Sequence, residues 1–144
     1  MIFAMDPGSE KTGIALVEED GSLCRKAVVP TADLEKYVGE YLDLHPVRAF
    51  VMGDGTRHRE IQKRMEALLR KRESDLRVSL VNEKYTTEMG EQRYKKEHPP
   101  KGLARLIPSG MRTVSVPVDD YVAWIIGEIY LGLIRPEDVG HRKF

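Results

Sequence analysis

The chain opens with the stretch Met1-Ile-Phe-Ala-Met-Asp6-Pro-Gly8-Ser-Glu-Lys11-Thr-Gly13-Ile-Ala-Leu-Val17, and this stretch decides the fold that we expect. Two apolar runs typical of β-strands flank a loop that carries Gly8 and Gly13, and the first run ends at Asp6. Glycine permits tight turns and lets a phosphate approach the backbone without meeting a Cβ atom. The pattern therefore suits a site for a metal ion, a phosphate, or both. The alternative is an ordinary hairpin that exposes Asp6 to solvent.

The composition indicates one domain in a reducing compartment. A chain of 144 residues can bury a core without disulfides or metal ions. Lys and Arg together number 23 and are balanced by 23 Asp and Glu, so no overall positive charge points to nucleic acid, although local basic patches remain compatible with it. Cys24 is the single cysteine, which leaves no internal disulfide and no cysteine zinc site. We expect a cytoplasmic protein with no signal peptide and no membrane-spanning segment.

Hydrophobic periodicity predicts alternating strands and helices after an initial meander of strands. Residues 98–117 are basic and rich in proline and glycine, which predicts a long irregular loop. We expect one domain over residues 1–134 and a C-terminal tail over residues 135–144. The predicted strands cover residues 2–6, 13–19, 22–29, 47–52 and 76–81, and the predicted helices begin near residues 31, 57, 86 and 119, the last ending at Arg135-Pro136.

This order of elements predicts a mixed five-stranded sheet. Three antiparallel strands come first, and two parallel strands follow across helical connections, which places helices on both faces. Right-handed crossovers give the spatial strand order 3-2-1-4-5. Asp6 then lies at the carboxyl edge of the first strand, where open α/β sheets bind ligands. Glu83 follows the fifth strand and falls at the same edge.

A third acidic element begins the last predicted helix. Asp119 and Asp120 lie in its first turn, from which a carboxylate can reach the same edge of the sheet. The alternative is that both aspartates only favour the helix dipole. Three carboxylates brought together repel one another unless cations lie between them, so the arrangement predicts a Mg²⁺ or Mn²⁺ site. At this point, either Asp119 or Asp120 can be the third carboxylate.

Three segments of the chain, residues 6–15, 81–93 and 120–126, resemble the motifs of one known family. They are similar to the YqgF/RuvX family, which consists of Holliday-junction-resolvase-like nucleases with a ribonuclease H-like fold that are implicated in ribosome biogenesis through 5′-end processing of pre-16S rRNA. The resemblance runs from Met1 to about Leu133. The chain departs from the family pattern at Asn82, Gly90 and residues 53–56, which bears on the substrate more than on the chemistry.

The resemblance implies that Asp6, Glu83 and Asp120 are catalytic carboxylates that bind metal. Asp120 is preferred because the family's acid stands three residues before an alanine, here Ala123, and Asp119 is expected as a further metal ligand. Basic and loop residues are expected to bind the substrate. From the motifs and the basic segments together, these are Gly8, Lys11, Thr86, Thr87, Arg93, Arg57, Arg105 and Arg112.

The expected reaction is hydrolysis of phosphodiester bonds by two divalent ions about 4 Å apart. The substrate is expected to be nucleic acid, with RNA favoured over branched DNA. A resolvase-like DNA endonuclease and a noncatalytic nucleic-acid-binding or ribosome-maturation module are alternatives. A further alternative is an ATP-binding phosphotransferase, because actin-like kinases share the Asp-x-Gly-x-x-x-x-Gly hairpin, although such enzymes also need a second domain.

Overall fold

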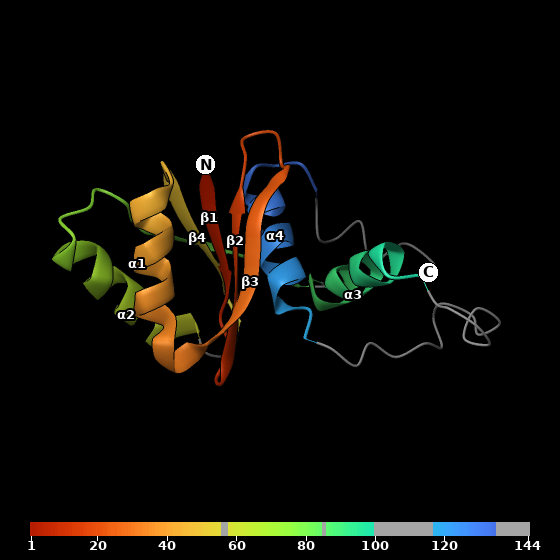
Figure 1. Ribbon diagram of the computed structural model, residues 1–144, viewed down its shortest axis with the longest axis horizontal. Coiled ribbons are helices and arrows are strands. Elements are labelled where there is room, and N and C mark those ends of the chain that lie inside the picture. The colour runs from red at the N-terminus through yellow and green to blue at the C-terminus, as the bar shows by residue number, and fades with distance from the viewer. Residues whose placement is uncertain (56–57, 85, 100–116, 135–144) are drawn as a thin grey trace.

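The computed structural model describes residues 1–55, 58–84, 86–99 and 117–134 (Figure 1). Within these residues, strands and helices alternate after an initial three-stranded meander. The strands are β1 (Ile2–Asp6), β2 (Lys11–Val17), β3 (Leu23–Pro30), β4 (Ala49–Gly53) and β5 (Val78–Val81). The helices are α1 (Leu34–Leu44), which follows the short 3₁₀ helix η1 (Thr31–Asp33), then α2 (His58–Lys71), α3 (Thr86–Glu97) and α4 (Asp119–Tyr130).

The strands form one mixed sheet in the order β3-β2-β1-β4-β5, as predicted. β1 pairs with β2, and β2 with β3, in antiparallel fashion, since short turns connect them. β4 pairs parallel with β1, and β5 parallel with β4. Parallel neighbours require a crossover, which α1 supplies before β4 and α2 before β5. The carboxyl ends of β1, β4 and β5 therefore share one edge of the sheet.

One core lies between the sheet and the helices α1 and α2 (Figure 1). Phe3 on β1 and Phe50 on β4 are both fully buried, and their ring centroids lie 4.8 Å apart. Val38 from α1 and Met65 from α2 pack over them. The apolar spacing of the two helices thus buries one stripe of each against the same face of the sheet.

A second core lies on the opposite face, under α4 (Figure 1). Gly127 lets this helix approach the sheet, because an added Cβ would stand 2.8 Å from a methyl group of Val17. α3 packs mainly on α4, where Tyr94 meets Tyr121 edge to face at a centroid distance of 5.9 Å. Helices therefore cover both faces, as predicted from the crossovers.

Several element boundaries differ by a few residues from those that we predicted, and the start of β2 and the end of α4 have a clear structural cause. β2 begins at Lys11 instead of Gly13, since its antiparallel pairing with β3 extends back to that residue. α4 was expected to end at Arg135-Pro136 and ends at Tyr130. Gly132 has a φ of +75°, and its amide and that of Leu133 bond back to the carbonyls of Ile129 and Glu128. This turn is a typical glycine termination of a helix.

Most of the predicted loop over residues 98–117 lies outside the described residues, as does the whole tail over residues 135–144. The division into a domain and a tail stays a prediction. Among the helices that the structure describes, none is long and apolar enough to span a bilayer.

Candidate functional site

Asp6 is the last residue of β1 and lies at the carboxyl edge of the sheet, as predicted. It pairs across the ladder with Gly13 of β2, so the hairpin after β1 begins beside its carboxyl group. Burial, together with the neighbouring carboxyl groups of Glu83 and Asp119, raises the pKa of Asp6 from 3.8 to about 8. Three acidic elements distant in sequence thus meet at one place.

Asp119 reaches Asp6 because α4 begins directly over Gly13. A Cβ atom added to Gly13 would stand 1.8 Å from the backbone carbonyl oxygen of Asp119, so only glycine permits this approach. The first residue of the helix is thereby held opposite the end of β1, where the Asp119 carboxyl group helps to raise the pKa of Asp6.

The carboxyl group of Glu83 lies between two glycines, Gly53 at the end of β4 and Gly55 just after it. A Cβ on Gly53 would stand 2.1 Å from Oε2 of Glu83, and one on Gly55 would stand 1.9 Å from Oε1. Oε2 is buried and has no hydrogen-bond partner among the described residues. Burial and the nearby Asp54 carboxylate raise the pKa of Glu83, while His58 and the Gly55 amide oppose this shift. A buried acceptor without a partner is costly, so a ligand at this oxygen would be favourable.

The backbone around Glu83 is fixed by further hydrogen bonds. Its amide donates to Oδ1 of Asp54 at 3.2 Å, and the Asp54 amide donates to the Val81 carbonyl at 3.0 Å. The Thr86 hydroxyl donates to the Glu83 carbonyl at 2.6 Å. The ends of β4 and β5 and the start of α3 are therefore tied together around this glutamate.

Sequence reasoning missed Asp54 and His58 as members of this site. Asp54 directly follows β4, and His58 is the first residue of α2. Nδ1 of His58 lies 2.6 Å from the Gly55 carbonyl oxygen, so it carries the proton of this hydrogen bond. The signal in the sequence was the place of Asp54 and His58 shortly after a buried strand beside β1, because that places them at the same edge as Asp6.

The glycine loop after Asp6 is held by two buried threonine hydroxyl groups. Oγ1 of Thr12 lies 2.8 Å from Oγ1 of Thr31, and the Thr31 hydroxyl donates to the Gly8 carbonyl at 2.9 Å. The Gly8 amide donates to Oγ1 of Thr12 at 3.4 Å. A Cβ on Gly8 would stand 2.1 Å from the Lys11 carbonyl oxygen, so the tight turn requires glycine there. The loop is thus preorganised beside Asp6.

Asp120 lies elsewhere, although the sequence favoured it as the third carboxylate. Its Oδ2 forms an ion pair with Nζ of Lys26 on β3 at 2.6 Å, and its Oδ1 accepts the Tyr121 amide at 2.9 Å. The same Lys26 lies 4.1 Å from the ring centre of Tyr121. In this structure Asp119, not Asp120, contacts Asp6, because one helical residue turns the side chain by about 100°.

Several residues expected to bind the substrate have structural partners instead. Arg93 forms an ion pair with Glu128 and stacks on Trp124, 4.3 Å from the ring centre. Thr86 is buried and holds the backbone of Glu83. The side chains of Lys11 and Thr87 are exposed. Arg57, Arg105 and Arg112 lie outside the described residues, so their expected role stays a prediction.

The donor atoms that the structure describes at this edge are of the type that binds a hard divalent cation, but they do not form a complete coordination site. Mg²⁺ and Mn²⁺ prefer carboxylate oxygens, and the unpartnered Oε2 of Glu83 is one such donor. Within the described residues, however, no group of three or more acidic, histidine or cysteine side chains is arranged to hold a metal ion. Asp6, whose pKa is raised, would have to lose its proton to bind the ion.

Comparisons with known proteins return solved structures only. No family model matches the sequence. No curated protein matches it either. One similar structure is a protein from Cytophaga hutchinsonii assigned to the sugar kinases, with 16% identity and a TM-score of 0.44 over 63% of this chain. Another is a ROK family protein from Streptococcus pneumoniae, solved in complex with sucrose, with 19% identity and a TM-score of 0.42 over 67% of this chain. This chain covers 38% and 39% of those two chains.

These findings correct the expectations drawn from the resemblance. Membership of the YqgF/RuvX family is wrong, since the similar structures belong to sugar kinases and the ROK family. The expected nuclease activity, and with it rRNA processing and junction resolution, is wrong for the same reason. The physical reason is visible in the motifs: Asp120 is engaged by Lys26, and Arg93 by Glu128. The short motifs matched in sequence, but in the structure Asp120 and Arg93 form ion pairs that involve α4.

Proposed function

We propose that this chain is the nucleotide-binding part of a phosphotransferase. It would hold the nucleotide's phosphates through Mg²⁺ or Mn²⁺ at the acidic edge, which is the end of the sheet where Asp6, Glu83 and Asp119 lie. The observation that carries this proposal is the buried, unpartnered Oε2 of Glu83, together with the Asp6 and Asp119 carboxyl groups close by. A carboxylate cluster beside a glycine-rich turn is suited to a cation that bridges protein and phosphate oxygens.

Each residue has a distinct role in the proposed site. Asp6, Asp119 and Glu83 would supply oxygen ligands, and the bound ion would supply charge stabilisation at a phosphoryl group. The glycine loop, fixed by Thr12 and Thr31, would let a phosphate come close to the backbone. The repulsion between these carboxylates, which is unfavourable without an ion, would then be replaced by attraction to the bound cation.

Three further expectations from the sequence are kept as proposals. The order and directions of the strands support a ribonuclease H-like assignment for the sheet. The single Cys24 supports a cytoplasmic location. Nucleic acid as a partner, with RNA favoured, was expected from the resemblance and from basic residues, of which Arg93 pairs with Glu128 within the fold. Phosphotransferases of this type close a second domain over the nucleotide, so we expect binding from this chain and transfer only with such a part.

Calorimetric titration with Mn²⁺, followed by ADP, tests the proposal. We expect saturable Mn²⁺ binding that Glu83→Gln weakens about tenfold or more, because the variant removes a charged ligand. Glu40→Gln, at an exposed position of α1, is the matched control and should bind like the wild type. Mn²⁺ should increase ADP binding above the level measured in EDTA, and Glu83→Gln should lose this Mn²⁺-dependent increase. The absence of Mn²⁺ binding, or equal binding by Glu83→Gln, would refute the metal site. Mn²⁺ binding that leaves ADP binding unchanged would refute nucleotide binding at the metal site.

A further inference from the structure

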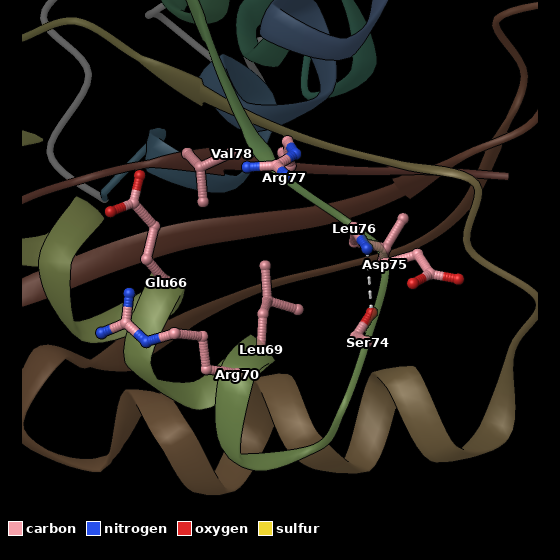
Figure 2. A pocket seen from close by; sticks show the side chains of 8 residues that line it. All are labelled: Glu66, Leu69, Arg70, Ser74, Asp75, Leu76, Arg77 and Val78. Carbon is pink, nitrogen blue, oxygen red and sulfur yellow. Dashed lines mark hydrogen bonds between the residues drawn. The ribbon is translucent and has the colours of Figure 1, made fainter.

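A cavity of about 590 Å³ lies between the C-terminal half of α2 and the segment that enters β5 (Figure 2). Its volume falls within the range of sites that hold small organic ligands. The cavity reaches Val78, the first residue of β5, whereas Glu83 follows the last residue of that strand. It is therefore separate from the acidic edge, at the opposite end of β5.

Two arginines without partners line this cavity. Arg70 comes from α2 and Arg77 from the segment before β5, and neither forms an ion pair, a hydrogen bond or a ring contact through its side chain with the described residues. Most other arginines in the described part of the chain are engaged: Arg48, Arg64, Arg72 and Arg93 in ion pairs, and Arg25 on a tyrosine ring. Two guanidinium groups without partners at one cavity favour the binding of an anion. The oxygens of a phosphate group can accept paired hydrogen bonds from the N–H groups of a guanidinium.

The rest of the lining combines apolar and acceptor groups. Leu69, which is 2% exposed, comes from α2, and Leu76 and Val78 come from the other wall, as Figure 2 shows. The carboxylates of Glu66 and Asp75 also border the cavity, so two negative charges balance the two guanidinium groups. A simple anion would meet repulsion there. A matching ligand needs hydroxyl groups as donors and an apolar portion as well as its anionic group.

The wall that separates the two arginines is fixed by a defined turn. The Ser74 amide donates to the Leu69 carbonyl at 2.9 Å, and the Glu73 amide donates to the Arg70 carbonyl at 3.0 Å. Oγ of Ser74 accepts the Leu76 amide at 3.1 Å. The backbone positions of Arg70 and Arg77 are thus set before any ligand arrives, which lowers the entropic cost of binding.

We propose that this cavity binds a nucleoside monophosphate, with its phosphate at Arg70 and Arg77, its ribose hydroxyls at Glu66 and Asp75, and its base against Leu69 and the neighbouring apolar side chains. This ligand supplies all three kinds of group that the lining requires, and it fits within the volume. The site is independent of the metal-bound phosphates of the proposed function.

Methyl NMR titration of the whole chain with AMP in EDTA tests this proposal, since EDTA removes divalent ions from the acidic edge. We expect saturable shifts at the methyl groups of Leu69, Leu76 and Val78. Arg70→Gln and Arg77→Gln should each weaken binding about tenfold or more, because each removes a charge-assisted hydrogen bond. Arg59→Gln is the matched control. Arg59 is an exposed arginine of the same helix that has no partner among the described residues and does not line the cavity.

Two further probes separate the contributions of the lining. Adenosine lacks the phosphate and ribose 5-phosphate lacks the base, so both should bind at least several-fold more weakly than AMP. Adenosine binding as tightly as AMP would refute the role of the arginines. Equal weakening by Arg59→Gln, or no shift at the three methyl-bearing residues with millimolar AMP, would refute the site. Because the wild type carries this last readout, a variant that fails to fold does not obscure the result.

Discussion

The backbone carbonyl oxygen of Asp119 lies over Gly13, only 1.8 Å from where a Cβ atom on that glycine would stand. This approach places the start of α4 beside the end of β1, and it is why Asp119 meets Asp6. The lack of a side chain at Gly13 therefore allows the acidic residues to come together at this edge of the sheet. Replacing Gly13 with a larger residue should affect both the packing of α4 and the cluster of carboxyl groups.

Gly13→Ala should destabilise the fold by roughly 1–3 kcal/mol, because the added methyl group must displace a helix backbone. Urea unfolding followed by circular dichroism measures this change. Gly39→Ala is the control: a Cβ at Gly39 in α1 meets only the side chain of Arg72, at 3.7 Å, so this variant should gain about 0.5–1 kcal/mol. A Gly13→Ala variant as stable as the wild type would mean that α4 can shift without cost.

The stability of the metal-free protein should fall as the pH rises from about 4 to about 8. Asp6 keeps its proton up to a pKa of about 8 in the folded chain, against 3.8 for an ordinary aspartate, so the folded state binds more protons within this window. The stabilising effect is complete below the lower value and lost above the upper one. Asp6→Asn should flatten this slope and raise the melting temperature at pH 8. An unchanged pH profile in the variant would contradict the raised pKa.

Asp119→Asn and Asp120→Asn should have opposite consequences. Asp120 holds Lys26 at 2.6 Å, and both side chains are largely buried, so its replacement should cost about 1–3 kcal/mol of stability. Asp119→Asn should lower the affinity for Mn²⁺ while keeping or raising stability, since it removes one acid from beside Asp6. Unfolding curves and calorimetry on the same two variants measure both effects. If only Asp120→Asn lost Mn²⁺ affinity, Asp120 and not Asp119 would be the metal ligand.

Glu73→Gly should stabilise the chain by about 1 kcal/mol. Glu73 has a φ of 55° in the turn that ends α2, a conformation that costs a residue with a Cβ atom about 1–2 kcal/mol. Glycine adopts it without strain at this position of a helix terminus. Glu73→Ala keeps the Cβ atom and removes the same carboxylate, so it serves as the control and should gain little. Equal gains in the two variants would point to charge instead of backbone strain.

The sheet was predictable because its signals are local. The apolar runs of the strands and the helical spacing of apolar residues each act within a few residues. Right-handed crossovers then leave few ways to arrange five strands, and the order 3-2-1-4-5 is confirmed. The end of α4 was predicted too late, because the glycine turn at Gly132 ends the helix before Arg135-Pro136.

The acidic edge was predictable only in part. The positions of Asp6 and Glu83 follow from strand ends, which the sequence indicates directly. The choice between Asp119 and Asp120 depends on the rotation of α4, which its packing on Gly13 and Gly127 sets. The family motifs favoured Asp120, yet Lys26, 94 residues away in the chain, engages that carboxylate. No local pattern predicts such a pairing.

By itself, the sequence determined the order of the strands, the faces that the helices cover, and the delivery of Asp6 and Glu83 to one edge. Periodicity and strand ends suffice for these features, because they depend on neighbours along the chain and on a few topological rules. Only the tertiary structure decided which aspartate meets Asp6, that Oε2 of Glu83 is left unpartnered between two glycines, and that Arg70 and Arg77 share a cavity. These features depend on the packing of segments far apart in the sequence, where a rotation of one residue exchanges one side chain for another.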